Sequence, residues 1–192
     1  MSDQTTPGQV LLFWFGGPEK RGRRRRRWFE KDARFDQEIR ERFLPAWEQA
    51  AAGRFAHWKD APADCLALIV TLDQFPRHLF RGTARAFATD AAALDTARHA
   101  VERGHDRALL PVERLFVYLP FEHSEALEDQ VRACELTKPL EAFQETADVY
   151  RYAVAHHDII ARFGRFPHRN AALGRVSTEA ELQFLKQPGS AF

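Results

Sequence analysis

The chain has 192 residues, of which 45% are hydrophobic, and its 28 Lys and Arg nearly balance its 27 Asp and Glu. This length fits a single domain with its own core, and the balanced charge gives no general attraction to nucleic acid or membranes. No apolar run approaches the roughly 18 residues of a membrane span, and Met1–Gln9 lacks the pattern of a secretory signal. We therefore expect a cytoplasmic protein with no membrane partner.

The first 27 residues are expected to be partly loop. Thr6 and Pro7 favour the start of a short helix that ends at Gly16. The run Arg23–Arg27 follows, and five adjacent like charges favour an exposed, solvated loop. A contact with nucleic acid through this run is the alternative, which we favour less because no second basic patch accompanies it.

The next helix is expected to begin after Asp32, whose carboxylate can cap it. Phe35, Ile39 and Phe43 recur at helical spacing and so predict one buried stripe. Pro45 should kink or break this helix, because proline removes a main-chain donor.

The segment 63–75 predicts a helix in the centre of the domain, because Cys65–Val70 is apolar on all sides. A buried β-strand is the rival prediction for those six residues, but the length of the segment favours helix. Pro76 should end it, leaving residues 77–85 as a loop.

Five further helices are expected towards the C-terminus, separated by proline and glycine. They span 91–103 after a cap at Asp90, 112–119 up to an interruption at Pro120, 125–137 after a cap at Ser124, 139–163, and a last helix from the capping box Thr178–Glu181 to about Lys186. Residues 187–192 form a tail. The prediction is one all-α domain over 1–192, an antiparallel array of about eight helices.

Three helix interruptions concentrate polar side chains, at 73–85, 120–125 and 156–170. Interrupted helices leave main-chain N–H groups free, and arginines beside them can grip a carboxylate or phosphate. The expected ligand-binding residues are Asp73, Arg77, Arg81, Arg165, His168, Arg169 and Asn170. The equally weighted alternative is that these arginines pair with Asp73, Asp90, Glu122 and Asp158 to hold loops together.

Acid–base chemistry is the expected role of His123, flanked by Glu122, with His156 as its partner across the helices. His156 should face the core on the stripe of Val149, Tyr152 or Ala153, Ile159 or Ile160, and Phe163, whereas Asp158 and Arg162 should point away. The alternative is that each histidine is a core residue bonded to a carbonyl. The chain has no His-x-x-x-His spacing and no pair of Glu-x-x-His motifs for facing helices, so no metal site or cofactor is predicted.

Several motifs in order resemble a known family. They are Phe13-Trp-Phe-Gly16, Trp28-Phe-Glu-Lys-Asp32, Leu72-Asp-Gln-Phe-Pro-Arg77, Phe80-Arg-Gly-Thr83, Tyr118-Leu-Pro-Phe-Glu-His-Ser124 and Arg162-Phe-Gly-Arg-Phe-Pro-His-Arg-Asn170. Together they resemble the bacterial family called domain of unknown function 924, over nearly the whole chain. The resemblance implies a tetratricopeptide-like helical superhelix and brings no activity, substrate or cofactor. The chain departs from it at the arginine run and at His78, where an asparagine is expected.

The favoured hypothesis is a small-molecule binding protein or enzyme with an Arg- and His-lined pocket for an anionic ligand. The alternatives are a module that binds a protein partner, or a homodimer, through a concave helical surface, and nucleic-acid binding through Arg23–Arg27.

Overall fold

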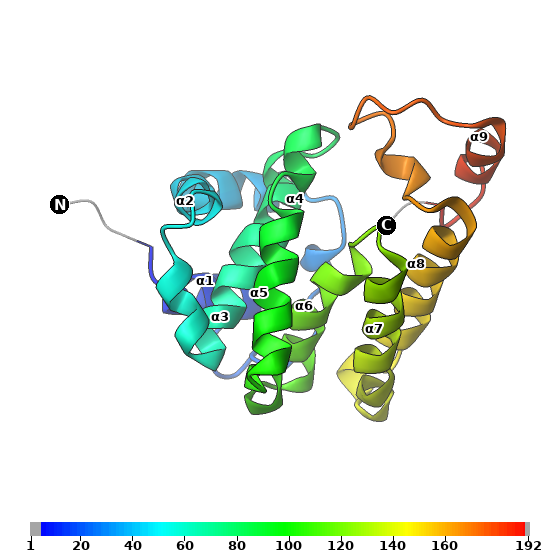
Figure 1. Ribbon diagram of the computed structural model, residues 1–192. Helices are drawn as coiled ribbons and strands as arrows, with labels where there is room; N and C mark the ends of the chain where they lie inside the picture. Colours follow the sequence, from blue (N-terminus) through cyan, green and yellow to red (C-terminus); the bar gives the residue numbers. More distant parts are fainter. Residues whose placement is uncertain (1–4, 191–192) are drawn as a thin grey trace.

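All regular structure in the computed structural model, which describes residues 5–190, is helical (Figure 1). The α-helices are α1 (Pro7–Phe15), α2 (Ala33–Ala51), α3 (Pro62–Ile69), α4 (Phe75–Leu79), α5 (Asp90–Glu102), α6 (Pro111–Glu122), α7 (Leu127–Thr137), α8 (Val149–Phe163) and α9 (Glu179–Leu185). The shorter elements are η1 (Arg26–Trp28), η2 (Ala56–Asp60), η3 (Val70–Gln74), η4 (Ala84–Phe87), η5 (His105–Ala108), η6 (Lys138–Ala142), η7 (Gln144–Thr146) and η8 (Pro167–Arg169).

Elements α3, η3 and α4 follow one another without a gap and form one helical rod. Residues 5–190 therefore contain eight separate α-helical rods. Helices α3, α5, α6, α7 and α8 pack each against the next, and α9 lies at the end of the array beyond α8 (Figure 1). The predicted all-α array of about eight helices is therefore confirmed. No helix within residues 5–190 is both long enough and apolar enough to cross a membrane.

The predicted helix starts at Thr6, Asp32 and Thr178 are confirmed. The Thr6 hydroxyl accepts from the Gln9 amide, Asp32 accepts from the first turn of α2, and Thr178 forms a reciprocal capping box with Glu181. These caps satisfy main-chain donors that a helix start leaves without partners.

The prediction that Pro76 ends the central helix was wrong. The chain passes through one π turn, η3, and continues as α4 to Leu79. Proline has no N–H to donate to the carbonyl of the residue four positions earlier in the chain. That carbonyl belongs to Leu72, and it accepts a hydrogen bond from the Thr89 hydroxyl at 2.5 Å instead. A donor from a neighbouring segment thus replaces the missing one. Pro45 likewise lies inside an unbroken α2.

Four other boundaries also differ from those predicted. Helix α6 continues through Pro120 to Glu122, and α7 begins at Leu127 without a side-chain cap. The Ser124 hydroxyl instead donates to Asp129 at 2.7 Å and accepts from the Ala126 amide. The segment from residue 139 is not one helix, because η6 and η7 precede α8. Asp90 is the first residue of α5 and its carboxylate bonds arginine, so it is not the predicted cap.

The arginine run is only in part the solvated loop that was predicted, because the side chains of Arg23 and Arg26 are 73% and 90% exposed whereas the others are packed against other segments. Arg23 bonds Glu145 at 3.1 Å, Arg24 pairs with Asp148, and Arg25 donates to the main-chain carbonyls of Phe13 and Trp14 at the end of α1. Arg27 lies over the Phe35 ring at 3.9 Å. These partners lie far along the chain. The run therefore links the end of α1 to the segment at the beginning of α8.

The main core extends from α1 to the start of α8, and Cys65–Val70 lies fully inside it, as predicted. A second, smaller core of Ile159, Ile160 and Phe166 holds the C-terminal end together. Helix α8 buries Val149, Ala153 and His156 on its inner face, as expected; of the two residues expected at the second position of the stripe, Ala153 is buried and Tyr152 is 40% exposed.

Candidate functional site

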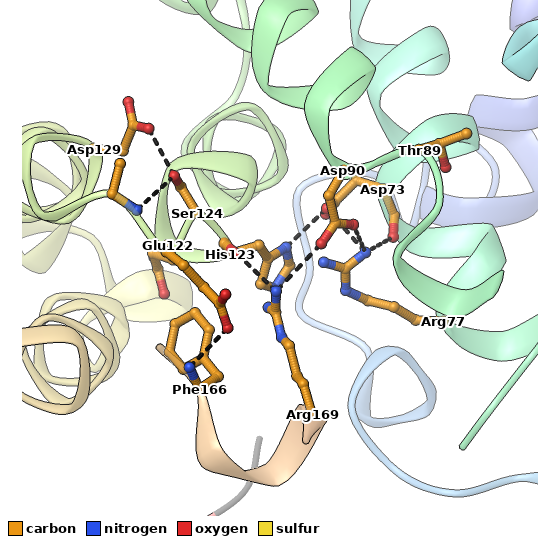
Figure 2. A network of polar contacts seen from close by, with 12 residues as sticks. Asp73, Arg77, Thr89, Asp90, Glu122, His123, Ser124, Asp129, Phe166 and Arg169 are labelled. Carbon is orange, nitrogen blue, oxygen red and sulfur yellow. Dashed lines mark hydrogen bonds and ion pairs between the residues drawn. The ribbon is translucent and has the colours of Figure 1, made fainter. Parts of the chain in front are cut away.

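Two of the predicted interruptions and part of the third meet in one cluster. The π turn η3 carries Asp73, α4 carries Arg77, the end of α6 carries Glu122 and His123, and η8 carries Arg169 (Figure 2). Asp90, from the first turn of α5, and His156, from α8, complete it. The cluster forms where helix ends converge, as the sequence predicted.

The Asp73 carboxylate orients the His123 ring. Its Oδ1 lies 2.8 Å from His123 Nδ1, and its Oδ2 accepts from the Gln74 amide. Burial alone would raise the pKa of Asp73, but the charge of Arg77 and the contacts from His123 outweigh it and bring the pKa to about 2. Asp73 is therefore ionised, and His123 donates through Nδ1, which leaves its Nε2 lone pair available as a base.

Two arginines approach Asp90 from different elements (Figure 2). Arg77 Nη1 lies 3.0 Å from Asp90 Oδ1 and 3.2 Å from Asp73 Oδ1, whereas Arg169 Nη1 lies 3.4 Å from Asp90 Oδ2. Arg169 Nη1 also donates to the His123 carbonyl at 3.0 Å. Its guanidinium lies between the Phe87 and Phe166 rings, at 4.8 and 4.5 Å.

Each of these arginines keeps one buried donor without an acceptor among the described residues, Arg77 Nη2 and Arg169 Nε. Buried donors without partners are rare in folded proteins. Burial and the nearby charge of Arg77 lower the pKa of Arg169 to about 10, so the two guanidiniums repel each other across the cluster. The alternative prediction, that these arginines pair with Asp73 and Asp90, is therefore confirmed, but the pairing leaves one donor on each arginine without an acceptor among the described residues.

Glu122 sits at the floor of the cluster as a neutral acid. Burial and the charge of Asp73 raise its pKa to about 8, and its Oε1 has no hydrogen-bond partner among residues 5–190. Its Oε2 is 3.6 Å from His156 Nδ1, which donates instead to the Tyr152 carbonyl at 2.8 Å. Burial lowers the pKa of His156 to about 3, so this ring is also neutral.

The charges of the cluster balance, whereas the sequence suggested a hollow rich in positive charge. Arg77 and Arg169 face two carboxyl groups, Asp73 and Asp90, and both Glu122 and His156 are uncharged. Burial and Arg77 lower the pKa of His123 too. Among residues 5–190, neither Glu122 nor Asp158 forms the ion pair with arginine that the alternative proposed; they lie beside His156 and His157 instead.

Three predicted site residues lie outside the cluster. Arg81 forms a fork with Asp36, and Arg165 forms one with Glu181 at 2.6 and 2.8 Å. Asn170 donates to Ser177 and accepts from Arg175, so it holds the following loop. His168 lies close enough to the cluster that burial and the charge of Arg169 lower its pKa to about 4.

The cluster has a buried floor and a partly open rim. The side chains of Asp73 and Glu122 are 0% and 2% exposed, whereas those of His123, Arg77 and Asp90 are 14%, 19% and 21% exposed. Solvent therefore reaches the side on which Asp90 bridges the arginines. Two surface hollows, of about 410 and 310 Å³, lie elsewhere, one along α2 and α4 and one between α5 and α7.

Sequence reasoning missed the π turn and the aromatic pair around Arg169. Asp73 occupies that turn, which places its carboxylate and the Arg77 guanidinium on the same side of the cluster. The signal available in the sequence was Pro76 itself, since a proline that does not end a helix requires a local change of hydrogen-bond register. Phe87 carried no signal, because nothing near it in sequence points to Arg169.

Fold and cluster define an all-helical protein with a charge-balanced Asp–His–Arg centre at the convergence of its helix ends. The chain belongs to the family described as bacterial protein of unknown function (DUF924), whose model matches residues 10–189, so the predicted resemblance is confirmed. A solved structure of a protein of unknown function, ATU0120 from Agrobacterium tumefaciens, is 42% identical, with a TM-score of 0.83 over 95% of this chain and 97% of that one. No curated protein matches the chain.

Proposed function

We propose that the cluster binds a small anionic molecule, a carboxylate or phosphate, between Arg77 and Arg169. The observation that carries the proposal is that each arginine has one buried N–H donor without an acceptor among the described residues. These donors are Arg77 Nη2 and Arg169 Nε. Guanidinium is the side chain suited to gripping a planar or tetrahedral oxyanion with several N–H groups at once.

Asp90 holds the place that such a ligand would take. Its carboxylate bridges the two guanidiniums from the open rim, and its contact with Arg169 is long at 3.4 Å. An incoming oxyanion that satisfied the two remaining donors would compete well with this bridge, because each donor carries the cost of burial without a partner. Asp90 can then turn to solvent.

Acid–base chemistry on the bound molecule is the second half of the proposal. Asp73 and Glu122 are two carboxyl groups whose pKa values stand near 2 and 8, and such divergence marks separate roles for paired carboxyls. Asp73 orients His123 as the general base, and Glu122 is a carboxylic acid that holds a proton at neutral pH. A π turn beneath the base adds support, since π turns occur often at functional sites.

Thermal unfolding with added anions tests the binding step. Inorganic phosphate, acetate, succinate and citrate are titrated into the wild-type protein and into Arg169→Met, which keeps the length of the side chain but not its charge. A ligand at about one hundred times its Kd should stabilise the wild type by about 2.7 kcal/mol, and Arg169→Met should lose most of this.

Arg103→Met is the matched control, because Arg103 is exposed at the end of α5 and bonds no side chain among the described residues. It should respond to each anion as the wild type does. The proposal is wrong if none of the anions raises the melting temperature, or if both variants lose the effect equally.

A further inference from the structure

One of the two surface hollows lies along α2 and α4, outside the cluster. Its volume is about 410 Å³, and its wall includes Gln37 and Arg40 of α2 together with Arg81 and Thr83 of the loop after α4. Arg81 was expected in the cluster with Arg77. Its position here leaves a guanidinium that the proposed function does not use.

Arg81 is held in place by Asp36 and the buried His78. Its Nε and Nη2 lie 2.7 and 2.9 Å from the two Asp36 oxygens, and Asp36 Oδ1 also lies 2.7 Å from His78 Nδ1. The His78 ring is 5% exposed and packs edge-on against Trp14 and Phe35. The same combination of carboxylate, imidazole Nδ1 and arginine occurs in the cluster, where Asp73 contacts His123 and Arg77.

Some N–H donors of Arg40 and Arg81 at this hollow take no part in the contacts just described. Arg81 uses one edge of its guanidinium on Asp36, and its Nη1 has no acceptor among residues 5–190. Arg40 donates through Nη2 to the Leu79 carbonyl, and its Nη1 and Nε have no acceptor in the same part of the chain. Two guanidiniums therefore face one carboxylate, which leaves a net positive charge.

Part of the wall is apolar. Ala33, Leu79 and Phe80 line it beside the two arginines, whereas Gln37 and Thr83 are polar. Small-molecule sites commonly combine such an apolar wall with a few charged groups that fix the orientation of the ligand. Both parts are present here, and neither belongs to the cluster around Asp73.

We propose that this hollow is a second, independent binding site for a small organic oxyanion, a carboxylate or phosphate monoester whose short apolar body lies on Ala33 and the edge of Phe80. Arg40 and Arg81 hold the anionic group. Asp36 and His78 are positioning residues that fix the direction of Arg81.

Heteronuclear NMR on the full chain tests the proposal, with phenyl phosphate, benzoate and inorganic phosphate as probes. Saturable shifts are expected at the Nε–H signals of Arg40 and Arg81 and at the Thr83 amide. Arg40→Met should weaken binding by about tenfold, the effect of losing one charge-assisted contact. Phenyl phosphate and benzoate, which carry an apolar body, should bind more tightly than inorganic phosphate.

Arg34→Met is the matched control, because Arg34 lies on the same helix with its side chain 90% exposed, and it should bind the probes as the wild type does. Arg169→Met should also retain these shifts, which separates this site from the cluster. The proposal is overturned if no saturable shift occurs, if Arg34→Met weakens binding as much as Arg40→Met, or if Arg169→Met alone abolishes it. Equal affinity for all three probes overturns the role of Ala33 and Phe80.

Discussion

Two carboxyl groups of the same cluster are driven to opposite protonation states. Asp73 receives contacts from a guanidinium, an imidazole and an amide, and together they overcome the cost of burying its charge. Glu122 receives no such contact at Oε1 and also faces the charge of Asp73, so burial keeps it neutral. The state of each group is thus set by its immediate partners, because both are buried to a similar extent.

Replacing Glu122 by Gln should change how stability depends on pH. The folded-state pKa of about 8 lies above the ordinary value of 4.5. The stability that the neutral acid contributes is therefore fully present below pH 4.5 and is lost as pH rises towards 8, by on the order of a few kcal/mol. Glu122→Gln, which stays neutral, should flatten this fall. Urea unfolding between pH 5 and pH 9 measures it.

Glu128→Gln provides the control, because Glu128 is an exposed glutamate in the next helix. Its stability profile should run parallel to that of the wild type. Parallel profiles for Glu122→Gln and the wild type would mean that Glu122 is ionised in the folded protein, and the assignment of a general acid would fail with it.

The sequence predicted His123, Glu122 and His156 because imidazole and carboxyl groups were dense at helix ends. Arg81 and Arg165 looked equivalent to Arg77 by the same measure, yet both lie elsewhere. Their carboxylate partners, Asp36 and Glu181, are 45 and 16 residues away along the chain. Local density identifies candidate residues, but only the fold decides which charges neutralise one another.

At the scale of elements, proline was a poor guide to where helices end. The chain runs through Pro45, Pro76 and Pro120 without ending a helical rod. The caps at Thr6, Asp32 and Thr178 were predictable because each depends on residues within four positions. Whether the helix continues past Pro76 depends on Thr89, which the π turn and the following loop bring to the Leu72 carbonyl.

A double-mutant cycle on Thr89 and Pro76 tests this account. Thr89→Val should destabilise the protein by about 1–3 kcal/mol, because the buried Leu72 carbonyl loses its donor and Trp47 Nε1 loses its acceptor. In the Pro76→Ala background the restored main-chain N–H can serve Leu72 instead. The cost of Thr89→Val should then fall by about 1 kcal/mol, as measured by urea unfolding.

Thr96→Val combined with Pro76→Ala is the reference cycle. The Thr96 hydroxyl also donates to a helix carbonyl, that of Ala92, but at a position with no proline nearby. Its cost should be the same in both backgrounds. Strict additivity for Thr89 and Pro76 would show that the hydroxyl does not replace the missing N–H.

At the scale of the molecule, the C-terminal end, called here the C-terminal unit, has a small core of its own beside the helical array. This core of Ile159, Ile160 and Phe166 is distinct from the main core, and Phe163 packs on Phe184 of α9 within it. The sequence predicted the helices of this end but not its separate core, because a division of the core depends on contacts between distant segments. Arg169, a member of the cluster, follows Phe166 in this unit, so the site lies at the junction of the two cores.

Glu125 is one of the polar links across that junction, and its removal should loosen the C-terminal unit alone. It accepts from the Phe166 amide at 2.8 Å and from both terminal nitrogens of Arg175 at 2.7 and 3.0 Å. A charge-assisted contact of this kind contributes about 1.5–3 kcal/mol. Glu125→Gln should therefore speed amide hydrogen exchange in residues 165–178 by about tenfold to a hundredfold, through local opening. Exchange in α3, inside the main core, should stay unchanged, and Glu128→Gln should alter neither region. A uniform acceleration across the chain would show instead that both cores open together as one cooperative unit.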